Sequence, residues 1–579
     1  MCGIFFYCDS SPQKFLRIER SIDEITGTLR QRGPDHQVIE TGEVAGRKWL
    51  SLNSVLAIRT SINEPSKALR PSDNFQAFAY NGESYEHSHR DKDDSIIFKE
   101  LLASGEFKNK RSHHKGFFAF CALNNNLLSF GVDYLAEKSL FFSQCGSSFF
   151  VSSDLASIVR AVSILERTSV LNENKIREYF CTRHLIQFNE TVYKRIKKCM
   201  PGQVYNYGLQ NNKLSEITVA DAMADIYEHF FSITPPRLDK REILEITESY
   251  LSDATHDLFG RSDVSFVLSG GVDSTLVTCF AAKKAFDFGE RIKTLTLSFG
   301  GKDLPAMRMP EVSSEQKTVH VSHDVTLEEY EGSLRKLYLK MLMPMPTHSF
   351  PSFDVLCSLA NKQKSRILVG GEGADEIYNG YAAYAGFTRP VRYNHCSLSP
   401  YTSVLDEHGI FDQGEIEKSD LTRAFQSFDF SKKRRHIQNV SVSLFLDAIV
   451  QLSSAGLFCA DQVGGLWGIE SRSPLANPLV ISARLKLMLE NSWGPIYDEK
   501  ALLRSKLESL SPTWQSINVK KQGFSGFPTE IFSNYNRNQF CHRVSDLISV
   551  PKNSLMNKMG NPAVSWKVCN IGSFLDICV

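Results

Sequence analysis

The residues whose types and spacing most clearly suit a chemical function form a short turn near the middle of the chain. Residues 264–268, Val-Ser-Phe-Val-Leu, are mostly β-branched or aromatic and predict a buried strand. A Ser-Gly-Gly turn follows, and Asp273 and Ser274 open a run, residues 275–284, that predicts a helix. Glycines between a strand and a helix N-terminus let backbone N–H groups point at an approaching phosphate. The turn therefore predicts an anion site.

Two common nucleotide-binding signatures are missing from this turn. No Gly-Lys-Ser/Thr closes it, as in a Walker loop, and no Gly-x-Gly-x-x-Gly fingerprint is present. Its sequence, Ser-Gly-Gly-x-Asp-Ser, instead resembles the pyrophosphate loop of enzymes that cleave ATP between the α and β phosphates. The resemblance implies an ATP site, with candidate residues Leu268, Ser269, Gly270, Gly271, Asp273, Ser274, Phe299, Gly370 and Gly371.

An acidic loop follows a later predicted strand. Residues 366–369 read as a strand, and residues 371–376, Gly-Glu-Gly-Ala-Asp-Glu, come directly after it. Strands alternate with helices from residue 264 onward, which predicts a doubly wound parallel sheet with ligands at the carboxyl ends of its strands. We therefore expect this loop beside the Ser-Gly-Gly turn, with Asp273 and Asp375 supplying the oxygen ligands that Mg²⁺ prefers. Alternatively, Asp273 only caps its helix, which would leave the acidic loop unexplained.

Residue 2 is a candidate nucleophile. If the initiator Met is removed, Cys2 carries a thiol and an α-amine with a reference pKa of about 8, so the amine can accept the thiol proton. A cysteine at this position can also occur by chance. Four segments follow it in order, at residues 32–35, 59–62, 80–83 and 116–120. With Cys2-Gly-Ile they resemble the class II glutamine amidotransferase domain, whose fold is an N-terminal-nucleophile α/β/β/α sandwich.

This resemblance assigns roles in glutamine hydrolysis. A thiolate attacks the side-chain amide, and the oxyanion needs preorganised donors, for which the Asn81 amide and the Gly82 N–H are the candidates. Arg59 would bind the α-carboxylate of glutamine through a bidentate contact. Glu83 or Asp94 would bind its α-ammonium group. Taken singly, Arg59 and Asp94 could be surface charges, and a second aspartate next to Asp94 leaves its register open.

The second half resembles asparagine synthetases. Residues 371–381 match their second signature, and Glu372 corresponds to the carboxylate at the amide-forming centre, as a base for incoming ammonia. Lys500 lies in a Lys-x-x-Leu-Arg motif and would place a cation where charge builds on the α-phosphate or acyl oxygen. Departures from the family pattern are Val132, Asn477 and Val519.

The chain is too long for one ordinary core, so we expect several domains. They are a glutaminase domain at residues 1–210, a polar linker at 211–239, an ATP-pyrophosphatase domain at 240–540, and a tail at 541–579. Within the first, residues 160–205 read as a closing β segment, and irregular structure is expected through the linker.

Composition excludes several classes of protein. Hydrophobic residues are 42% and charged residues 23%, as in soluble globular enzymes, and 66 basic against 65 acidic residues give no nucleic-acid footprint. No apolar run reaches the roughly 18 residues of a membrane span. The 13 cysteines form no C-x-x-C pair, which favours a reducing compartment and a cytoplasmic location. A homodimer is compatible with the resemblance.

Together these features imply a glutamine-dependent amide ligase. Cys2 would release ammonia from glutamine, and the second domain would adenylate a carboxylate with MgATP, releasing pyrophosphate. Aspartate is the default acceptor, but residues 344–351 match the acceptor segment of relatives poorly. The alternatives are another acid, such as a natural-product or sugar-acid precursor, and a non-catalytic interaction-type homologue. A β-lactam-forming relative is disfavoured because that branch needs no working Cys2.

Overall fold

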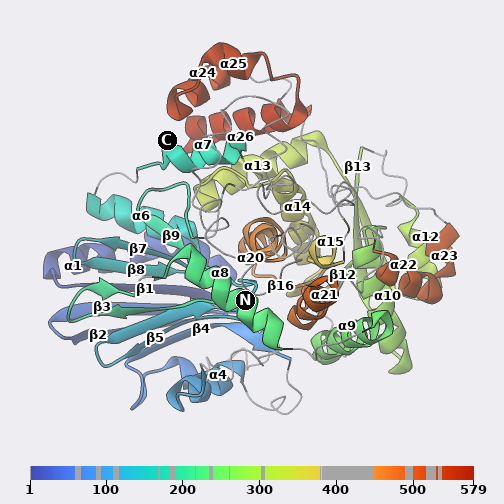
Figure 1. Cartoon of the computed structure of the whole chain (residues 1–579), viewed down its shortest axis with the longest axis horizontal. Coiled ribbons are helices and arrows are strands. Elements are labelled where there is room, and N and C mark those ends of the chain that lie inside the picture. The colour runs from blue at the N-terminus through green and yellow to red at the C-terminus, as the bar shows by residue number, and fades with distance from the viewer. Residues whose placement is uncertain are drawn as a thin grey trace.

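Three β-sheets and the helices around them make up the part of the chain that the structure describes (Figure 1). In this computed structural model the described residues are 2–58, 67–85, 93–107, 116–166, 170–181, 185, 189–215, 217–233, 239–259, 261, 263–300, 307–378, 380, 447–489, 500–516, 530–532 and 537–579. The predicted site residue Arg59 and the divergent residue Val519 lie outside them.

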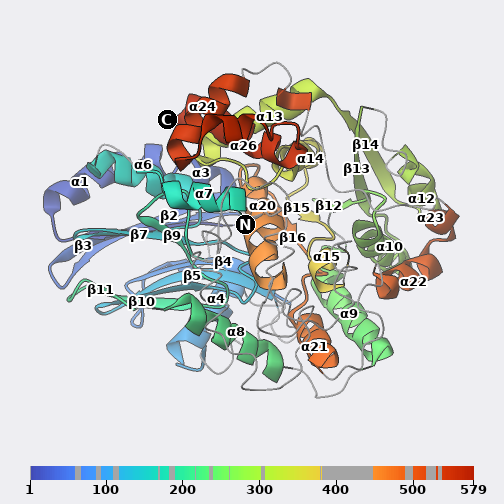
Figure 2. The ribbon, with the colours of Figure 1, turned by 45° about the horizontal axis from the view of Figure 1, so that its top comes forward.

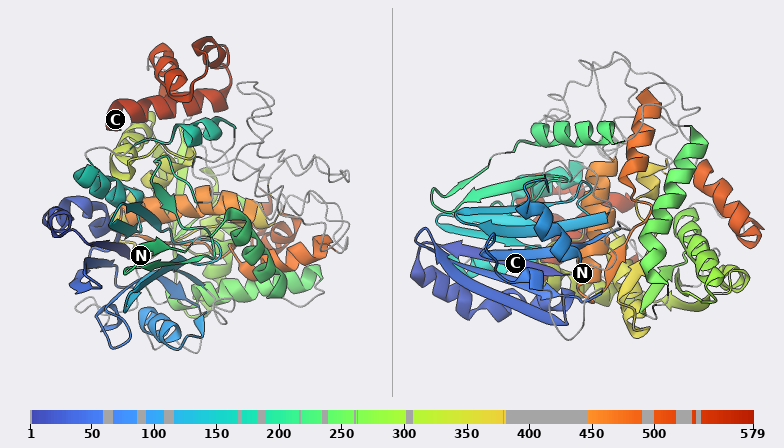
Figure 3. Two further views of the ribbon diagram at one scale, coloured as in Figure 1. Left: turned by 60° about the vertical axis from the view of Figure 1, so that its left-hand side comes forward. Right: turned by 90° about the horizontal axis from the view of Figure 1, so that it is seen from below.

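The first two sheets are antiparallel and lie face to face (Figure 3). One has the order β2-β3-β1-β8-β7-β9, with β1 Gly3–Asp9, β2 His36–Val44, β3 Arg47–Val55, β7 Phe141–Cys145, β8 Ser148–Ser152 and β9 Ile196–Lys198. The other has the order β11-β10-β6-β5-β4, with β4 Ala77–Ser84, β5 Gly116–Asn124, β6 Leu127–Val132, β10 Val204–Gly208 and β11 Lys213–Leu214.

Alternating apolar side chains explain why the sheets stack and why helices cover them. Along β1, Ile4 and Phe6 belong to the core shared with the second sheet, whereas Phe5 and Tyr7 pack with the helices on the outer face. Those helices include α1 Pro12–Arg20, α2 Ile22–Ile25, α3 Gly27–Arg32 and α6 Leu155–Glu166. On the other side, α4 Asp94–Ala103 covers the second sheet, where Phe98 contacts Phe118. The predicted α/β/β/α sandwich is confirmed.

Two local predictions in this half are wrong. Residues 160–205 are not a continuous β segment, because they contain most of α6 and all of α7 Glu173–Cys181. The supposedly irregular linker contains α8 Val219–Ser232, which begins with a capping box between Thr218 and Asp221. Its apolar residues recur at helical spacing and enter the core, so the period was present in the sequence beneath a polar composition.

The third sheet is parallel, as predicted. Its order is β14-β13-β12-β15-β16, with β12 Val264–Val267, β13 Lys293–Phe299, β14 Val319–Val325, β15 Ile367–Val369 and β16 Glu470–Arg472. The helices around it include α9 Lys240–Thr255, α10 Val272–Asp287, α12 Met309–Glu315, α13 Leu327–Met341, α14 Ser349–Lys362 and α15 Ala374–Ile377. Because the chain runs outward from β12 in both directions, the sheet has a switch point between β12 and β15, where such folds bind ligands.

The later elements pack mainly against the helices around this sheet and against helices of the first half of the chain (Figure 2). They are the π-helix η8 Asp447–Gly456, α20 Leu457–Gly465, α21 Pro478–Leu489, α22 Ala501–Leu510, α23 Pro512–Ser516, α24 Arg537–Ile548, α25 Lys552–Met556 and α26 Pro562–Cys578. None of the helices in the described part of the chain has both the length and the apolar character that crossing a membrane requires.

Candidate active sites

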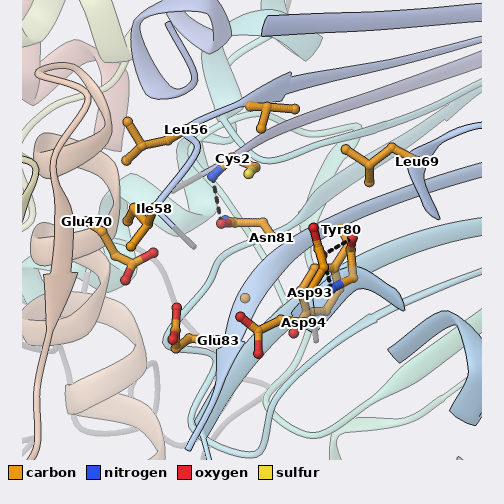
Figure 4. A pocket seen from close by; sticks show the side chains of 13 residues that line it. Cys2, Leu56, Ile58, Leu69, Tyr80, Asn81, Glu83, Asp93, Asp94 and Glu470 are labelled. Atoms are coloured by element: carbon orange, nitrogen blue, oxygen red, sulfur yellow. Dashed lines mark hydrogen bonds between the residues drawn. The ribbon is translucent and has the colours of Figure 1, made fainter. Parts of the chain in front are cut away.

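The first candidate site is a cavity of about 60 Å³ beside Cys2, at the start of β1 (Figure 4). It brings together the predicted residues Cys2, Asn81, Gly82, Glu83 and Asp94. Asn81 and Gly82 occupy consecutive positions on β4, so the strand presents the two predicted oxyanion donors side by side.

The Asn81 side chain is oriented by Cys2. The Cys2 main-chain nitrogen donates a hydrogen bond of 2.8 Å to Asn81 Oδ1. This bond places the other end of the side-chain amide, Nδ2, away from that nitrogen. Asn81 Nδ2 is buried and has no hydrogen-bond partner among the described residues. A buried amide donor without a partner is what an oxyanion would satisfy. Burial raises the pKa of the Cys2 thiol, so attack requires a base.

The structure distinguishes the two adjacent aspartates. Asp93 caps α4, where its carboxylate accepts a hydrogen bond of 2.8 Å from the Ser95 N–H. Asp94 instead reaches across to β4, and its Oδ1 accepts a hydrogen bond of 3.1 Å from the Ser84 N–H. Both line the cavity, but only the Asp94 carboxylate bonds to the strand that carries Asn81. The register assumed for Asp94 is consistent with this position.

Residues of β16, almost 400 positions further along the chain, complete the cavity. Glu470 lines it together with Cys2, and Arg472 forms ion pairs of 2.9 Å with Glu470 and 3.1 Å with Glu83. Burial opposes ionisation of Glu470, but the positive charges of the chain N-terminus, Arg472 and Lys138 outweigh it and lower the pKa. The sequence analysis assigned no role to Glu470 or Arg472, although the Glu-x-Arg pattern at residues 470–472 was a usable signal. Glu83 is engaged by Arg472, which competes with its predicted contact to glutamine.

The second candidate site lies where the Ser-Gly-Gly turn meets the acidic loop. Strands β12 and β15 are parallel neighbours, with Phe266 beside Val369. A Cβ placed on Gly371 would lie 2.5 Å from the Ser274 nitrogen, so the acidic loop packs directly on the start of α10. The predicted pairing of the two loops is confirmed.

The turn itself is held by side chains on both sides. Ser269 Oγ and Ser274 Oγ lie 2.7 Å apart, and Gly270 has a φ of 88°, a conformation that glycine adopts without strain. Trp514 Nε1 donates a hydrogen bond of 2.9 Å to the Gly270 carbonyl, a contact that the sequence did not suggest. Gly271 is the N-cap of α10 and offers no side-chain cap, which suits an anion at this helix end.

Lys500 connects the two predicted metal ligands. Its Nζ lies 2.5 Å from Asp273 Oδ2 and 2.8 Å from Asp375 Oδ1. Burial lowers the pKa of Lys500, but the two carboxylates outweigh it, so the net shift is upward. Within the described part of the chain no group of three or more His, Cys, Asp or Glu side chains is arranged to hold a metal. The Lys500 ammonium group already lies between the two carboxylates, so their positions suit a positive charge. Mg²⁺ commonly binds through one or two carboxylates plus substrate phosphates. The pair therefore fits Mg²⁺.

Glu372 faces the start of α20. Its Oε2 lies 3.1 Å from the position of a Cβ on Gly456, so a larger residue at position 456 would press on the carboxylate. The residue as a whole is exposed, but burial of its carboxylate, followed by the negative charges of Asp375 and Asp273, raises its pKa to about 7. A carboxyl group with a raised pKa is better suited to act as a general base.

The other predicted ATP residues surround the same turn. The Leu268 N–H donates to the Leu295 carbonyl at 2.8 Å, and the Gly370 N–H donates to the Arg472 carbonyl at 3.0 Å, so both are held within the sheet. Phe299 ends β13. The divergent Asn477 is fully buried, and its Oδ1 accepts a hydrogen bond of 2.9 Å from the Leu479 N–H near the start of α21.

Comparisons with known proteins divide the chain in two. Residues 1–217 match the family described as Glutamine amidotransferase domain, and residues 247–560 match the family described as Asparagine synthase. We refer to these as the amidotransferase domain and the synthase region. The second match covers more than half of the chain.

Individual relatives are distant. Asparagine synthetase [glutamine-hydrolyzing] 3 of Bacillus subtilis (strain 168) is 22% identical over 66% of this chain and 63% of its own length. Asparagine synthetase [glutamine-hydrolyzing] 1 of the same strain is 22% identical over 66% of this chain and 59% of its own length. The alignments thus span less than two thirds of both relatives.

Among solved structures, glutamine phosphoribosylpyrophosphate amidotransferase from B. subtilis, complexed with ADP and GMP, shares 12% identity over 56% of this chain and 81% of that chain. Its TM-score of 0.26 is too low for any conclusion here. The family match therefore rests on the sequence, and it agrees with the parallel sheet and the paired loops described above. The chain belongs to the asparagine synthase family.

Proposed function

We propose that the protein is a glutamine-dependent ligase that transfers the amide nitrogen of glutamine to a carboxylic acid at the expense of ATP. The observation that carries this proposal is the Cys2 cavity, which is lined by Asn81, whose Nδ2 has no partner among the described residues, and by Glu470 of the synthase region. Because a residue of the synthase region lines the cavity of the nucleophile, this arrangement suits a reaction in which ammonia released at Cys2 is used by the synthase region.

In the first half-reaction the Cys2 thiolate attacks the glutamine side-chain amide. Once the initiator Met is removed, the α-amine of Cys2 acts as base, and its hydrogen bond to Asn81 Oδ1 orients it. Asn81 Nδ2 and the Gly82 N–H stabilise the oxyanion, and loss of one such donor typically costs about 3–4 kcal/mol. Asp94 binds the substrate ammonium group, and Arg59, which lies outside the described residues, binds its carboxylate.

In the second half-reaction ATP occupies the turn at residues 269–274. The N-terminus of α10 receives its phosphates, and Asp273 and Asp375 would hold Mg²⁺, which would supply charge neutralisation for the leaving pyrophosphate. Lys500 then pairs with developing negative charge on the phosphate or acyl oxygen, since its ammonium already lies between both carboxylates. The acceptor carboxylate attacks the α-phosphate and pyrophosphate leaves; ammonia then attacks the carbonyl carbon of the resulting acyl-adenylate, AMP leaves, and Glu372 accepts the proton that the nitrogen loses.

Aspartate is the first acceptor to test, because the similar proteins are named asparagine synthetases. Another carboxylic acid is the alternative, since residues 344–351 match the acceptor segment of relatives poorly and Asn477 replaces an aspartate. The domain limits 1–210, 211–239, 240–540 and 541–579, a homodimer and a cytoplasmic location remain predictions.

Pyrophosphate release measured against a panel of carboxylic acids tests the proposal. With MgATP and glutamine we expect one acid to stimulate pyrophosphate release. If only aspartate does so, aspartate is the acceptor. Cys2→Ala should abolish the glutamine-driven reaction and retain the ammonia-driven one, because the synthase site does not need the thiol. Absence of acid-stimulated release with either nitrogen source would refute the ligase.

Lys500→Ala provides a second, independent measurement. We expect it to lower pyrophosphate release about 100-fold or more with either nitrogen source, because a charge-stabilising group is lost. Glutamate release from glutamine should persist. Lys506→Ala is the matched control, since Lys506 lies on the same helix and pairs with Glu248 at 2.6 Å, away from the turn. Equal effects of both variants would contradict the role of Lys500.

A further inference from the structure

The last helix of the chain, α26, lies beyond the stretch that matches the synthase family, which ends at residue 560. Asn561 caps it by accepting hydrogen bonds from the Ala563 and Val564 N–H groups. From residue 564 to residue 574 every position is buried, on all sides of the helix. Figures 1 and 2 show it enclosed by α24, α13 and α7. A terminal helix buried all round is a structural member of the core rather than a loose tail.

One polar residue of α26 reaches the amidotransferase domain. Lys567 Nζ donates a hydrogen bond of 2.8 Å to the main-chain carbonyl of Tyr179, near the end of α7, where a cation complements the exposed carbonyls. The Tyr179 hydroxyl in turn donates a hydrogen bond of 3.2 Å to the carbonyl of Pro346, in the segment between α13 and α14. Lys567 thereby connects α26 to both halves of the molecule.

A second polar residue, Asn570, is fully buried and grips the same segment. Its Oδ1 accepts hydrogen bonds of 3.0 Å from the Met345 N–H and 2.9 Å from the Tyr338 hydroxyl, and its Nδ2 donates one of 2.9 Å to the Met345 carbonyl. Both backbone groups of Met345 are therefore satisfied by one side chain, as in a strand pairing. Buried backbone groups require such partners, so the conformation of the segment depends on Asn570.

Tyrosines from both halves hold the rest of the segment at residues 342–348. The Tyr193 hydroxyl, from the amidotransferase domain, donates to the Leu342 carbonyl at 2.7 Å, and the Tyr330 hydroxyl of α13 donates to the His348 carbonyl at 2.6 Å. Residues 343–346 are buried, so this segment does not present an open surface to a substrate. Its position instead determines where α14 begins.

The start of α14 packs against α20, a helix that lies near both candidate sites. Phe350 packs against Phe458 of α20, with ring centroids 6.1 Å apart. Further along α20, Asp461 forms a buried ion pair of 2.6 Å with Arg32, whose Nε donates to the Cys2 carbonyl at 3.4 Å. The residue before α20 is Gly456, which adjoins Glu372. Displacement of residues 342–348 would thus shift a helix that contacts Cys2 through Arg32 and adjoins Glu372.

We infer that α26 is a clasp that keeps the two active sites in register, with Asn570 and Lys567 as positioning residues. This inference rests on the proposed function, because it assigns to the clasp the efficient use of nitrogen released at Cys2. The hydrogen bonds of Asn570 and Lys567 described above go to Met345, Tyr338 and Tyr179, none of which is a candidate catalytic residue. The effect of losing them is therefore on the coupling of the two reactions rather than on either chemistry.

The test is the ratio of glutamate to pyrophosphate formed in the same reaction by Asn570→Leu, which has a similar volume and no hydrogen bonds. We expect the ratio to rise about fivefold or more, the lower end of typical coupling between sites. Ammonia-driven pyrophosphate release should fall by less than about twofold, since it needs no transfer between sites. Asp576→Asn is the matched control on the exposed end of α26, where Asp576 pairs with Arg543, and its ratio should equal that of the wild type.

An unchanged ratio of glutamate to pyrophosphate in Asn570→Leu would overturn the inference. This holds even if the melting temperature falls or both activities decline in parallel. If Asn570→Leu does not fold, Lys567→Met decides, because it keeps the apolar stem of Lys567 and removes its charge, which bonds the Tyr179 carbonyl and lies over the Tyr179 ring. Failure of the wild-type protein to release pyrophosphate with any acid would refute the proposed function, which is a separate result.

Discussion

Glu137 is a carboxyl group buried where the two halves meet, with 8% of its surface exposed. Its Oε1 has no hydrogen-bond partner among the described residues. Burial raises its pKa to about 8, and the negative charges of Asp133 and Glu470 contribute, while Lys138 opposes the shift. Single residues at this interface are thus held in protonation states that they would not have in water.

This shift makes Glu137→Gln a pH-dependent stabilising substitution. The pKa of Glu137 is about 8 in the folded state and about 4.3 in the unfolded chain, so the contribution of Glu137 to stability is lost as pH rises between these values. Glutamine does not ionise and avoids that loss. From these two pKa values we expect Glu137→Gln to gain roughly 4–5 kcal/mol over the wild type at pH 8 and little at pH 4.

Thermal unfolding at pH 4, 6 and 8 measures this difference. Glu43→Gln, at an exposed position on β2, is the control and should show no such pH dependence. A gain of equal size at every pH would mean that the effect of Glu137→Gln comes from packing and not from ionisation.

At the scale of elements, the synthase site depends on how closely two strand–loop units approach. Gly371 follows β15, Ser274 lies in the first turn of α10, which follows β12, and only hydrogen at the Gly371 Cα leaves room between them. The close approach places Asp375 and Asp273 within reach of one ammonium group, that of Lys500. Parallel neighbours with aligned carboxyl ends make this contact possible.

Gly371→Ala should separate these loops. The added Cβ would lie 2.5 Å from the Ser274 nitrogen and 2.7 Å from the Asp273 carbonyl carbon, and backbone atoms cannot yield as a flexible side chain can. We expect a loss of about 1–3 kcal/mol in unfolding free energy and of pyrophosphate release with either nitrogen source. Glutamate release should be retained, since the Cys2 cavity is elsewhere.

Gly332→Ala is the matched control, because a Cβ at this position on α13 meets no atom within 4 Å. It should be neutral or slightly stabilising, since alanine favours a helix. Chemical denaturation and the two product assays on both variants check the prediction, which fails if Gly371→Ala keeps full pyrophosphate release.

At the scale of the whole molecule, charged pairs cross the boundary between the two halves. Arg32 binds Asp461 at 2.6 Å with both side chains buried, Arg472 binds Glu83, and Arg366 binds Asp35. Buried pairs add little to stability relative to apolar packing, but breaking one leaves a charge without compensation. They therefore specify how the halves fit together.

Asp461→Asn should be strongly destabilising. Arg32 would remain buried without its anionic partner, which typically costs about 3–5 kcal/mol. Because Arg32 also donates to the Cys2 carbonyl, glutamate release should fall more than ammonia-driven pyrophosphate release. Asp23→Asn removes an exposed partner of Arg30 and should leave stability and both activities unchanged. Equal stability of the two variants in urea would contradict the prediction.

Local features of the fold and of each site were predictable from the sequence. Strand β12, the glycine turn and α10 follow one another within about 25 residues, so composition and turn chemistry specify them together. The same holds for the run of Asn81 and Gly82 on β4. The part of α6 from residue 160 onward was assigned to a β segment, and α7 and α8 were missed.

The sequence by itself determined the types of chemistry: a thiol at position 2, a phosphate-binding turn and an acidic loop after a strand. Only the tertiary structure decided which distant groups join them. Glu470 in the Cys2 cavity, Trp514 on the turn, Lys500 between two carboxylates and Asn570 on Met345 are all contacts between separate elements. Such contacts depend on how whole helices and sheets pack, and short-range patterns carry no information about that packing.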